Sequence, residues 1–244
     1  MSEGPARIQA DGVTVEKSGR LIVRGVSVTV HAGEVLGVLG PSGAGKSTFF
    51  GALVGEEGLA KGRVLLDGTD VSDLPLWRRA RLGLGYLPQT PSVLWDLSVE
   101  DNFRTFFRVA QNARASDEEV LAACAEVGLA EQRKVRAGSL SGGERRRLEL
   151  GRALTTKPTV LVCDEPFAGV DPKGAAHLGE LLAKLADSGV AVLLADHHVE
   201  EALRVCTRAL LLLDGAVALL ASPHDFRSDP LVQGRYLGTW EGTG

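Results

Sequence analysis

The sequence contains few cysteines and few aromatic residues, and both shortages exclude classes of protein. Its 244 residues include three cysteines, two tyrosines, three tryptophans and seven phenylalanines. Cys124, Cys163 and Cys206 are far apart and form no CxxC pair. This spacing excludes a disulfide framework and a cysteine metal site, so we expect buried free thiols in a reducing compartment.

Long apolar runs are also missing, which bears on membranes and secretion. The longest, including 190–195 and 209–213, are far shorter than the roughly 20 residues that a membrane-spanning helix requires. The first residues lack the basic and then apolar pattern of a secretion signal. The formal net charge of −4 argues against nucleic-acid binding. We therefore expect a soluble chain that meets a membrane only through partner proteins.

The periodicity of the apolar residues predicts an α/β fold. Residues 7–30 alternate in the manner of antiparallel strands, and a strand ends or turns back at Asp67-Gly68. The pattern becomes helical over 89–154, where Ser116–Glu119 fits a capping box at a helix start. The later residues alternate strands and helices, as in a parallel sheet. The strands expected there are 160–163, 190–195, 209–213 and 216–220, and the helices are 175–186 and 199–205.

The most informative segment is Gly40–Thr48, which fits the phosphate-binding pattern G-x-x-x-x-G-K-[ST]. It follows the apolar run 34–39, which suits a buried strand, and leads into a helical segment. Glycines let backbone N–H groups converge on an anion, and a helix N-terminus adds a favourable dipole. In this pattern Lys46 reaches the β- and γ-phosphates, and the Ser47 hydroxyl ligates Mg²⁺. The candidate nucleotide-binding residues are Gly40, Pro41, Ser42, Gly43, Ala44, Gly45, Lys46, Ser47 and Thr48.

Two carboxylates, Asp164 and Glu165, directly follow the apolar strand 160–163. Ligands of α/β sheets bind at the carboxyl ends of the strands. Asp164 is then placed to hold Mg²⁺ together with Ser47 or a water. Glu165 can polarise a water for attack on the γ-phosphate. An acidic turn after a strand is common, so this prediction depends on the phosphate loop of the same chain.

A second candidate anion site is formed by Ser141, Gly142, Gly143 and Glu144. Ser141 and Glu144 fit a capping box, so a helix should begin there. The serine hydroxyl, the free N–H groups and the helix dipole all favour an anion. As an isolated motif, however, a helix cap would explain the segment better, because one chain does not need two sites for one γ-phosphate.

Taken together, these motifs resemble the ATP-binding subunits of ABC transporters over nearly the whole chain. In that family, Leu140–Glu144 corresponds to the signature loop, which contacts the nucleotide held by a second subunit. The resemblance implies a P-loop ABC-type ATPase domain with an antiparallel β subdomain and a helical subdomain. It also implies a homodimer around two ATP molecules, with integral membrane permease subunits as partners. The chain would then lie peripherally on the cytoplasmic face of the inner membrane.

The resemblance assigns further residues by position. Gln89, in Tyr86–Gln89, matches the family's glutamine loop and would touch Mg²⁺ or the attacking water. Gly169–Pro172 matches a loop that crosses the dimer interface. His197 stands where the family places its switch histidine, so it would hydrogen-bond the γ-phosphate and orient Glu165. His198 is expected to point elsewhere.

The same resemblance divides the single domain 1–244 into parts. Segments 7–88 and 155–222 would form the nucleotide-binding core with its β subdomain. Segment 89–154 would form the helical lobe with the signature loop, and 223–244 would be a C-terminal tail.

One feature departs from the family pattern. Family members stack the adenine on an aromatic residue ahead of the phosphate loop, but no aromatic residue precedes Phe49 here. Lys17 or Val15 occupies roughly that place. Adenine stacking should therefore be weaker, whereas phosphate binding depends on other groups.

A narrower resemblance is to the ATP-binding subunit of lipopolysaccharide export systems. It is carried by 85–89, 97–102, 140–147, 164–172 and 236–238. Branched-chain amino-acid importers have related ATPases that also end near a Tyr-Leu-Gly, so import is the alternative. A non-transport ABC ATPase is disfavoured, because the chain has one motif set and no long heptad run. A nucleotide-gated scaffold is disfavoured by the presence of both Glu165 and His197.

Three arginines and two aromatic residues near these motifs have competing interpretations. We interpret Arg145-Arg146-Arg147 as a solvated helix face rather than a nucleic-acid patch. Phe103 is expected in the core of the lobe. Trp95 is expected to anchor a helix of the membrane partner.

Overall fold

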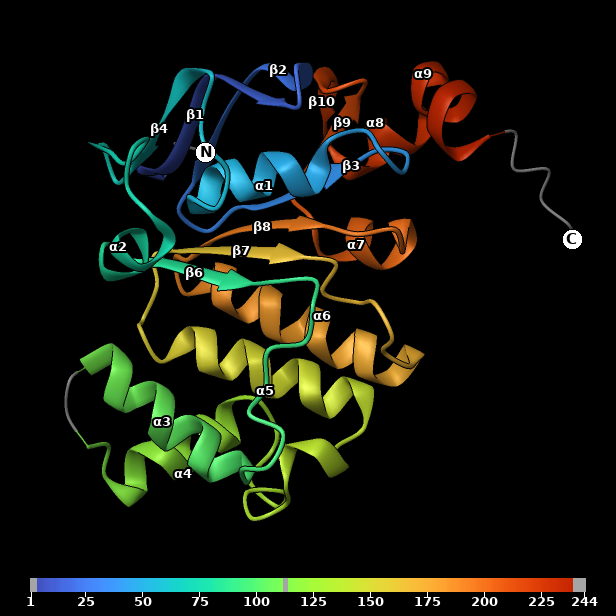
Figure 1. The fold of residues 1–244 in the computed structure, drawn as a ribbon. Helices are drawn as coiled ribbons and strands as arrows, with labels where there is room; N and C mark the ends of the chain where they lie inside the picture. Colours follow the sequence, from blue (N-terminus) through green and yellow to red (C-terminus); the bar gives the residue numbers. More distant parts are fainter. Residues whose placement is uncertain (1–3, 112–113, 239–244) are drawn as a thin grey trace, which may run out of the picture.

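The computed structural model describes residues 4–111 and 114–238, which form two sheets with helices between and beside them (Figure 1). The first sheet is antiparallel and follows the predicted alternation of residues 7–30. Its first two strands pair along their length and are joined by a turn at Ser18 and Gly19, both with positive φ. In spatial order its strands are β2 (Arg20–His31), β1 (Ala6–Lys17), β4 (Lys61–Leu66) and β5 (Thr69–Asp70).

The second sheet is parallel except at one edge, where β10 pairs antiparallel with β9. The strands β3, β7 and β8 are buried at every position, as expected of strands covered on both faces. In spatial order the strands are β10 (Ala216–Ala221), β9 (Arg208–Leu213), β3 (Val35–Leu39), β8 (Ala191–Ala195), β7 (Val160–Asp164) and β6 (Leu84–Leu87).

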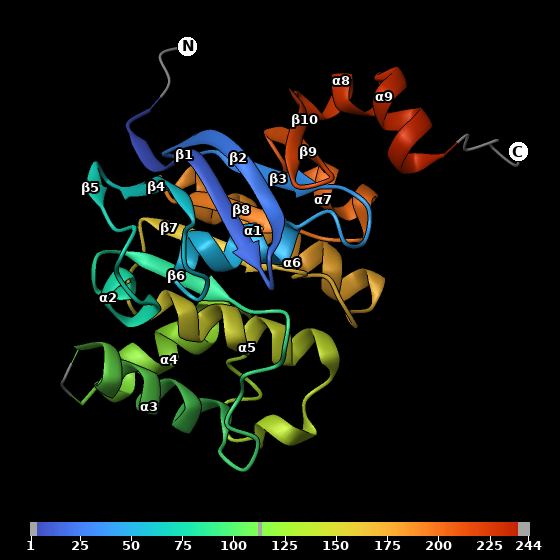
Figure 2. The ribbon, with the colours of Figure 1, turned by 45° about the horizontal axis from the view of Figure 1, so that its top comes forward.

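Helix α1 (Lys46–Val54) lies between the two sheets (Figure 2). Phe49 and Phe50 of this helix belong to a core cluster with Val13 and Val26 of the antiparallel sheet. The opposite face of the parallel sheet is covered by α6 (Pro172–Asp187) and α7 (Val199–Val205). The phosphate-loop helix is therefore packed from both sides, which fixes its N-terminus.

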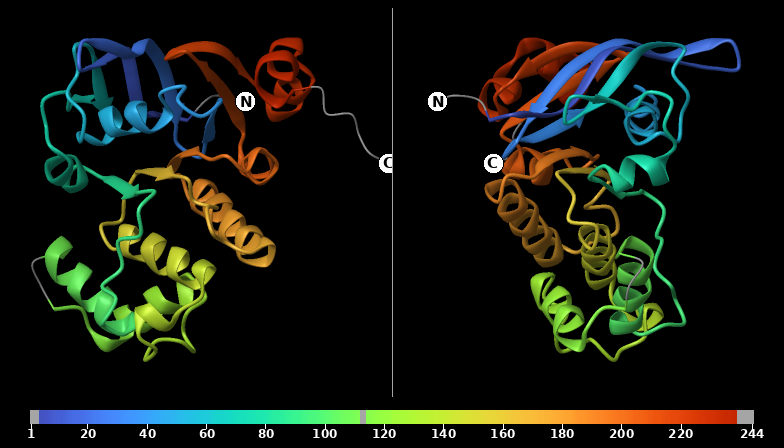
Figure 3. Two further views of the ribbon diagram at one scale, coloured as in Figure 1. Left: turned by 45° about the vertical axis from the view of Figure 1, so that its right-hand side comes forward. Right: turned by 90° about the vertical axis from the view of Figure 1, so that its left-hand side faces the viewer.

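A helical lobe lies beyond α6, on the side away from the antiparallel sheet (Figure 3). Its helices are α3 (Val99–Gln111), α4 (Asp117–Glu126) and α5 (Gly142–Leu154). Both predicted capping boxes are present, with Ser116 paired to Glu119 and Ser141 paired to Glu144. Phe103 is fully buried in the core of the lobe, as predicted.

Several short elements were not predicted. They are α2 (Leu76–Arg81), α8 (Pro223–Ser228), α9 (Pro230–Val232) and the π-helical turn Gln233–Leu237. Phe226 and Val232 are fully buried, so much of the segment after 222 packs against the sheet. Short helices give a weak periodic signal, and packing rather than propensity decides them.

The cysteines and the membrane expectation can be examined directly. All three thiols are free and buried, as predicted, and burial raises the pKa of Cys163 to about 12. Such a thiol carries little thiolate at neutral pH and is unreactive. Within 4–111 and 114–238, no helix has the length and apolar character needed to cross a bilayer.

Candidate functional site

The phosphate loop connects the end of β3 to the start of α1. Gly40 and Gly45 have φ values of 153° and 100°. A Cβ on Gly40 would lie 2.2 Å from the carbonyl oxygen of Leu212, and one on Gly45 would lie 2.9 Å from that of Ile22. Larger residues would therefore push the loop away from its neighbours at both positions.

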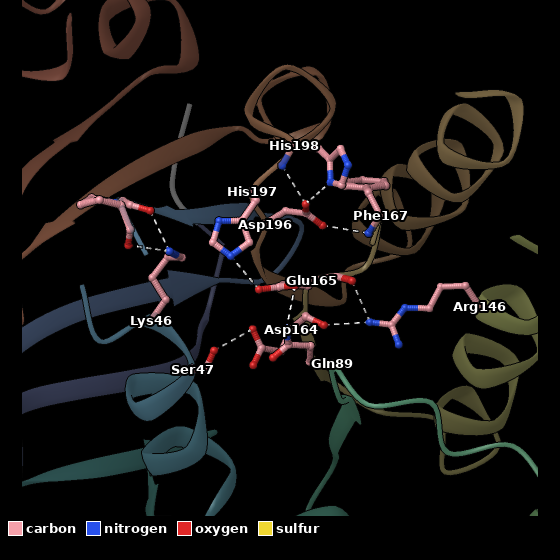
Figure 4. Close-up of polar contacts among 12 residues, drawn as sticks. Lys46, Ser47, Gln89, Arg146, Asp164, Glu165, Phe167, Asp196, His197 and His198 are labelled. Atoms are coloured by element: carbon pink, nitrogen blue, oxygen red, sulfur yellow. Dashed lines mark hydrogen bonds and ion pairs between the residues drawn. The ribbon is translucent and has the colours of Figure 1, made fainter. Parts of the chain in front are cut away.

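Lys46 is folded back onto its own loop. Its Nζ donates to the carbonyl oxygens of Gly40 at 2.7 Å and Pro41 at 3.0 Å, and only 7% of the residue is exposed (Figure 4). Burial lowers the pKa of Lys46, and the nearby carboxylates of Glu165 and Asp164 partly oppose this. Lys46 lines a pocket of about 220 Å³ together with Ile22, Ser42, Gly43, Gly45, Ser47, Thr48 and His197.

Asp164 ends β7 opposite the start of α1. The Ser47 hydroxyl donates to Asp164 Oδ1 at 3.4 Å, so two oxygens of the types that Mg²⁺ prefers face each other. Asp164 is 4% exposed, and burial raises the pKa of its carboxyl group. A bound cation would relieve this penalty. In residues 4–111 and 114–238, no cluster of three or more histidine, cysteine, aspartate or glutamate side chains could hold a metal ion.

Glu165 brings together residues that follow three neighbouring strands. Its Oε2 accepts from Gln89 Nε2 at 2.9 Å, after β6, and its Oε1 lies 2.8 Å from His197 Nε2, after β8 (Figure 4). The Glu165 side chain is 13% exposed and that of His197 is 49% exposed. The structure therefore brings the three predicted catalytic residues together at one edge of the sheet, with Gln89 and His197 each in contact with Glu165.

A buried carboxylate that the sequence did not reveal lies behind this cluster. Asp196 is fully buried and accepts from the backbone N–H groups of Phe167 and His198 at 2.8 Å each. His198 Nδ1 also lies 2.7 Å from Asp196, so His198 points away from Glu165, as expected. Asp196 thereby ties the loop after β7 to the loop after β8. Its position one residue before His197 was the only available signal.

The signature segment Ser141–Glu144 caps α5 and does not line the phosphate pocket of its own chain. The Ser141 hydroxyl accepts from the N–H of Glu144, and the Glu144 carboxylate accepts from the N–H of Ser141. The residues lining the pocket come from β2, the phosphate loop, the start of α1 and the loop after β8. An anion in this pocket would therefore meet Lys46 and its neighbours rather than Ser141 of the same chain.

The interpretation of three solvated arginines is wrong for Arg146. This residue is 5% exposed and donates to backbone carbonyls of the loops that carry Gln89 and Glu165. Residues three positions apart lie on the same face of a helix, so Arg146 shares the buried face of α5 with Gly143. Arg145 and Arg147 lie on either side of that face. Arg145 lies over the ring of Trp95, which is 48% exposed.

The two residues expected roughly at the place of the missing aromatic residue differ in their surroundings. Val15 is buried, whereas Lys17, at the end of the β1–β2 hairpin, forms an ion pair in which its Nζ lies 2.5 Å from Glu57 Oε1. A second pocket adjoins the phosphate pocket and shares Ile22 and Gly43 with it. Its lining contains no aromatic ring and consists of Arg20, Leu21, Ile22, Arg24, Gly43, Asp214 and Gly215.

The fold and the site together define a phosphate-loop nucleoside triphosphatase with an inserted helical lobe. The sequence model of the ABC transporter family matches residues 23–168, and the chain belongs to this family. The predicted family, fold class and ABC transporter ATPase activity are thereby confirmed.

Individual relatives resemble the chain over almost its whole length. The lipopolysaccharide export system ATP-binding protein LptB of Escherichia coli K12 is 40% identical and covers 96% of this chain and 98% of its own length. LptB of Acidithiobacillus ferridurans is 42% identical, covering 95% and 96%. A probable ABC transporter ATP-binding protein of Azorhizobium caulinodans is 41% identical, covering 95% and 83%. The ADP conformation of MJ1267, an ATP-binding cassette of an ABC transporter, superposes with a TM-score of 0.87 at 25% identity, covering 96% and 99%.

Proposed function

We propose that this chain drives lipopolysaccharide export, as the ATP-hydrolysing subunit of an ABC transporter with integral membrane permease subunits. Two relatives named for that system share 40–42% of its residues over at least 95% of the chain. The segments that carry the narrower resemblance border the site, because they include the loop of Gln89 and the strand end at Glu165. The membrane contact would be made through the permease subunits, on the cytoplasmic face of the inner membrane.

The roles of the site residues follow from their contacts. Lys46 would exchange its two carbonyl acceptors for the β- and γ-phosphates of ATP. Ser47, Asp164 and Gln89 would hold Mg²⁺, which supplies positive charge to the phosphate oxygens. Glu165 would take the proton of the attacking water, and His197 would hold the Glu165 carboxylate in place while meeting the γ-phosphate. The contact of Glu165 with both Gln89 and His197 is the observation that carries this assignment.

The two nucleotide sites would be completed by dimerisation. Ser141, Gly142, Gly143 and Glu144 form a helix N-terminus suited to an anion but lie outside the pocket of their own chain. In a homodimer that encloses two ATP molecules, each signature segment would meet the γ-phosphate held by the partner. ATP would close the dimer and hydrolysis would reopen it, which moves the attached permease helices.

The cargo is tested on the native assembly. The tagged chain is isolated from detergent-solubilised membranes, and the ATPase rate is measured with added lipopolysaccharide or with leucine and its binding protein. We expect integral membrane subunits to co-purify and lipopolysaccharide alone to stimulate turnover. Stimulation by the amino acid would instead support import. Recovery with ribosomes or DNA, and without membrane subunits, would support a non-transport ATPase.

A further inference from the structure

The guanidinium of Arg146 is surrounded by the loops of the catalytic cluster although the residue belongs to the signature helix α5. It makes five hydrogen bonds, as many as its N–H groups allow. One acceptor is the Glu149 carboxylate at 2.9 Å, and the other four are backbone carbonyls. No side chain that would contact a nucleotide is among these partners, so Arg146 can act only through other residues.

Three of the carbonyls belong to consecutive residues at the end of β7. Arg146 Nη2 donates to the carbonyl of Asp164 at 2.7 Å and to that of Glu165 at 3.0 Å (Figure 4). Arg146 Nε donates to the carbonyl of Pro166 at 3.2 Å. Glu165 has a φ of 49°, in the left-handed region that residues with a Cβ rarely adopt. Such a conformation persists only where the surroundings fix it. Arg146 and the carbonyl of Ala195, which accepts from the Glu165 N–H at 2.7 Å, supply those constraints.

The fourth carbonyl belongs to Pro88, which immediately precedes Gln89. Arg146 Nη1 donates to it at 2.7 Å. One planar guanidinium therefore sets the distance between the backbone that carries Gln89 and the backbone that carries Glu165, whose side chains touch at 2.9 Å. An arginine can do this because its donors have a fixed planar geometry, whereas a lysine offers one flexible ammonium.

The same face of α5 holds the next residues of the glutamine loop. Glu149 accepts from the N–H of Ser92, and Arg152 donates to the carbonyl of Ser92 at 2.7 Å. Both residues are buried. The contacts thus form a continuous polar row along α5, and any displacement of the signature helix would move the glutamine loop and the strand end with it.

We propose that Arg146 is a positioning residue for ATP hydrolysis, which holds Glu165 in its left-handed conformation and in register with Gln89. It thereby links the signature helix, which would serve the partner's nucleotide, to the catalytic cluster of its own chain. This inference depends on the proposed role of Glu165 as the general base.

The test compares Arg146→Gln with Arg146→Lys, Glu165→Gln and a matched control, Arg79→Gln, in the purified full-length chain. Arg79 is 1% exposed and donates to four backbone carbonyls around the end of α1, those of Ala52, Leu53, Ser72 and Leu74, so its loss removes similar bonds without touching the catalytic loops. We expect Arg146→Gln to lower kcat about 100-fold with a change in KM for ATP of less than about threefold. Arg146→Lys should recover part of the rate, and Arg79→Gln should keep the kcat of the original chain per folded molecule.

Each other result has a distinct meaning. If Glu165→Gln abolishes turnover but Arg146→Gln retains full kcat, the positioning role is wrong and the proposed function stands. If Arg146→Gln and Arg79→Gln lose kcat equally, and the loss follows the fall in melting temperature, Arg146 only stabilises the fold. Turnover that survives in Glu165→Gln would overturn the general-base assignment itself. Should Arg146→Gln fail to fold, the kcat of Arg146→Lys decides, and full activity there contradicts the inference.

Discussion

Two buried arginines show how the same chemistry serves different purposes in two regions of the molecule. Arg79 and Arg146 are both almost inaccessible, and both donate to four backbone carbonyls. Those of Arg79 belong to the end of α1 and the segment before α2, and none of them belongs to a predicted site residue. Those of Arg146 belong to the loops that carry Gln89 and Glu165. The comparison teaches that burial and hydrogen bonding alone do not distinguish a scaffold residue from a functional one.

The largest effect on turnover is expected in the catalytic region, at Glu165. Glu165→Gln keeps the shape of the side chain and its contacts with Gln89 and His197 but removes the proton acceptor. ATP binding should persist while turnover falls by at least about 100-fold, the usual contribution of a general base. Phosphate release at saturating ATP, with fluorescent-nucleotide binding as the control, measures both. A variant that hydrolyses ATP normally would remove Glu165 from its role.

Replacing Arg79 should have the opposite effect, with a loss of stability and no loss of turnover. Arg79→Gln leaves buried carbonyls without donors, so the free energy of unfolding should fall by about 2 kcal/mol. The kcat per folded molecule should stay unchanged, because no acceptor of Arg79 belongs to a catalytic loop. Chemical denaturation and single-temperature kinetics test the two halves of this prediction. A reduced kcat in a fully folded sample would erase the distinction between the two regions.

Asp164 belongs to the catalytic region, and its buried carboxylate should lower the free energy of unfolding. Because burial raises its pKa, the unfolded chain loses this proton at lower pH than the folded chain does. The folded state is therefore penalised once the pH rises above about 4, and the penalty grows until the pH exceeds the raised pKa of the folded chain. Asp164→Asn should stabilise the nucleotide-free chain by on the order of 1 kcal/mol at pH 7 and abolish Mg²⁺-dependent turnover.

The pH dependence is the control for that change. The stability difference between Asp164→Asn and the original chain should shrink towards zero as the pH is lowered to about 4. Denaturation curves at several pH values measure it. A difference that does not vary with pH would assign the stabilisation to packing rather than to the buried charge.

The smallest effect is expected where the adenine of ATP would bind, and it concerns KM rather than kcat. Lys17, which with Val15 is expected roughly where family members present an aromatic ring, forms an ion pair with Glu57. Lys17→Tyr should lower KM for ATP several-fold, since a stacked ring contributes about 1 kcal/mol, and should leave kcat unchanged. Titration with ATP and GTP measures the gain and its dependence on the base. An unchanged KM for both nucleotides would show that the base binds elsewhere.

Much of the fold was readable because its strongest signals are local. The strand 160–163, the helix 199–205 and both capping boxes were found by apolar runs and by residues at fixed offsets. The phosphate loop and the carboxylates after β7 were likewise recognisable from contiguous residues. Their meeting in space follows from the rule that parallel strands present their carboxyl ends at one edge.

The features that escaped prediction depend on contacts between distant segments. Nothing in Arg145-Arg146-Arg147 shows that only the middle residue faces the sheet, because that depends on how α5 packs. The left-handed conformation of Glu165 is equally invisible, since the sequence offers no glycine there. The short helices after 222 are stabilised by burial of Phe226 and Val232 rather than by their own propensity. The domain boundaries and the individual site roles stay predictions.

The central claim is that two copies of this chain close around ATP, with the signature segment of each completing the site of the other. It is tested most directly by the solution mass of Glu165→Gln with saturating ATP and Mg²⁺, compared with ADP and with a second variant that adds Ser141→Arg. The account predicts a dimer with ATP only, and a monomer whenever Ser141→Arg is present. A mass that stays monomeric with ATP, or a dimer indifferent to Ser141→Arg, would contradict it.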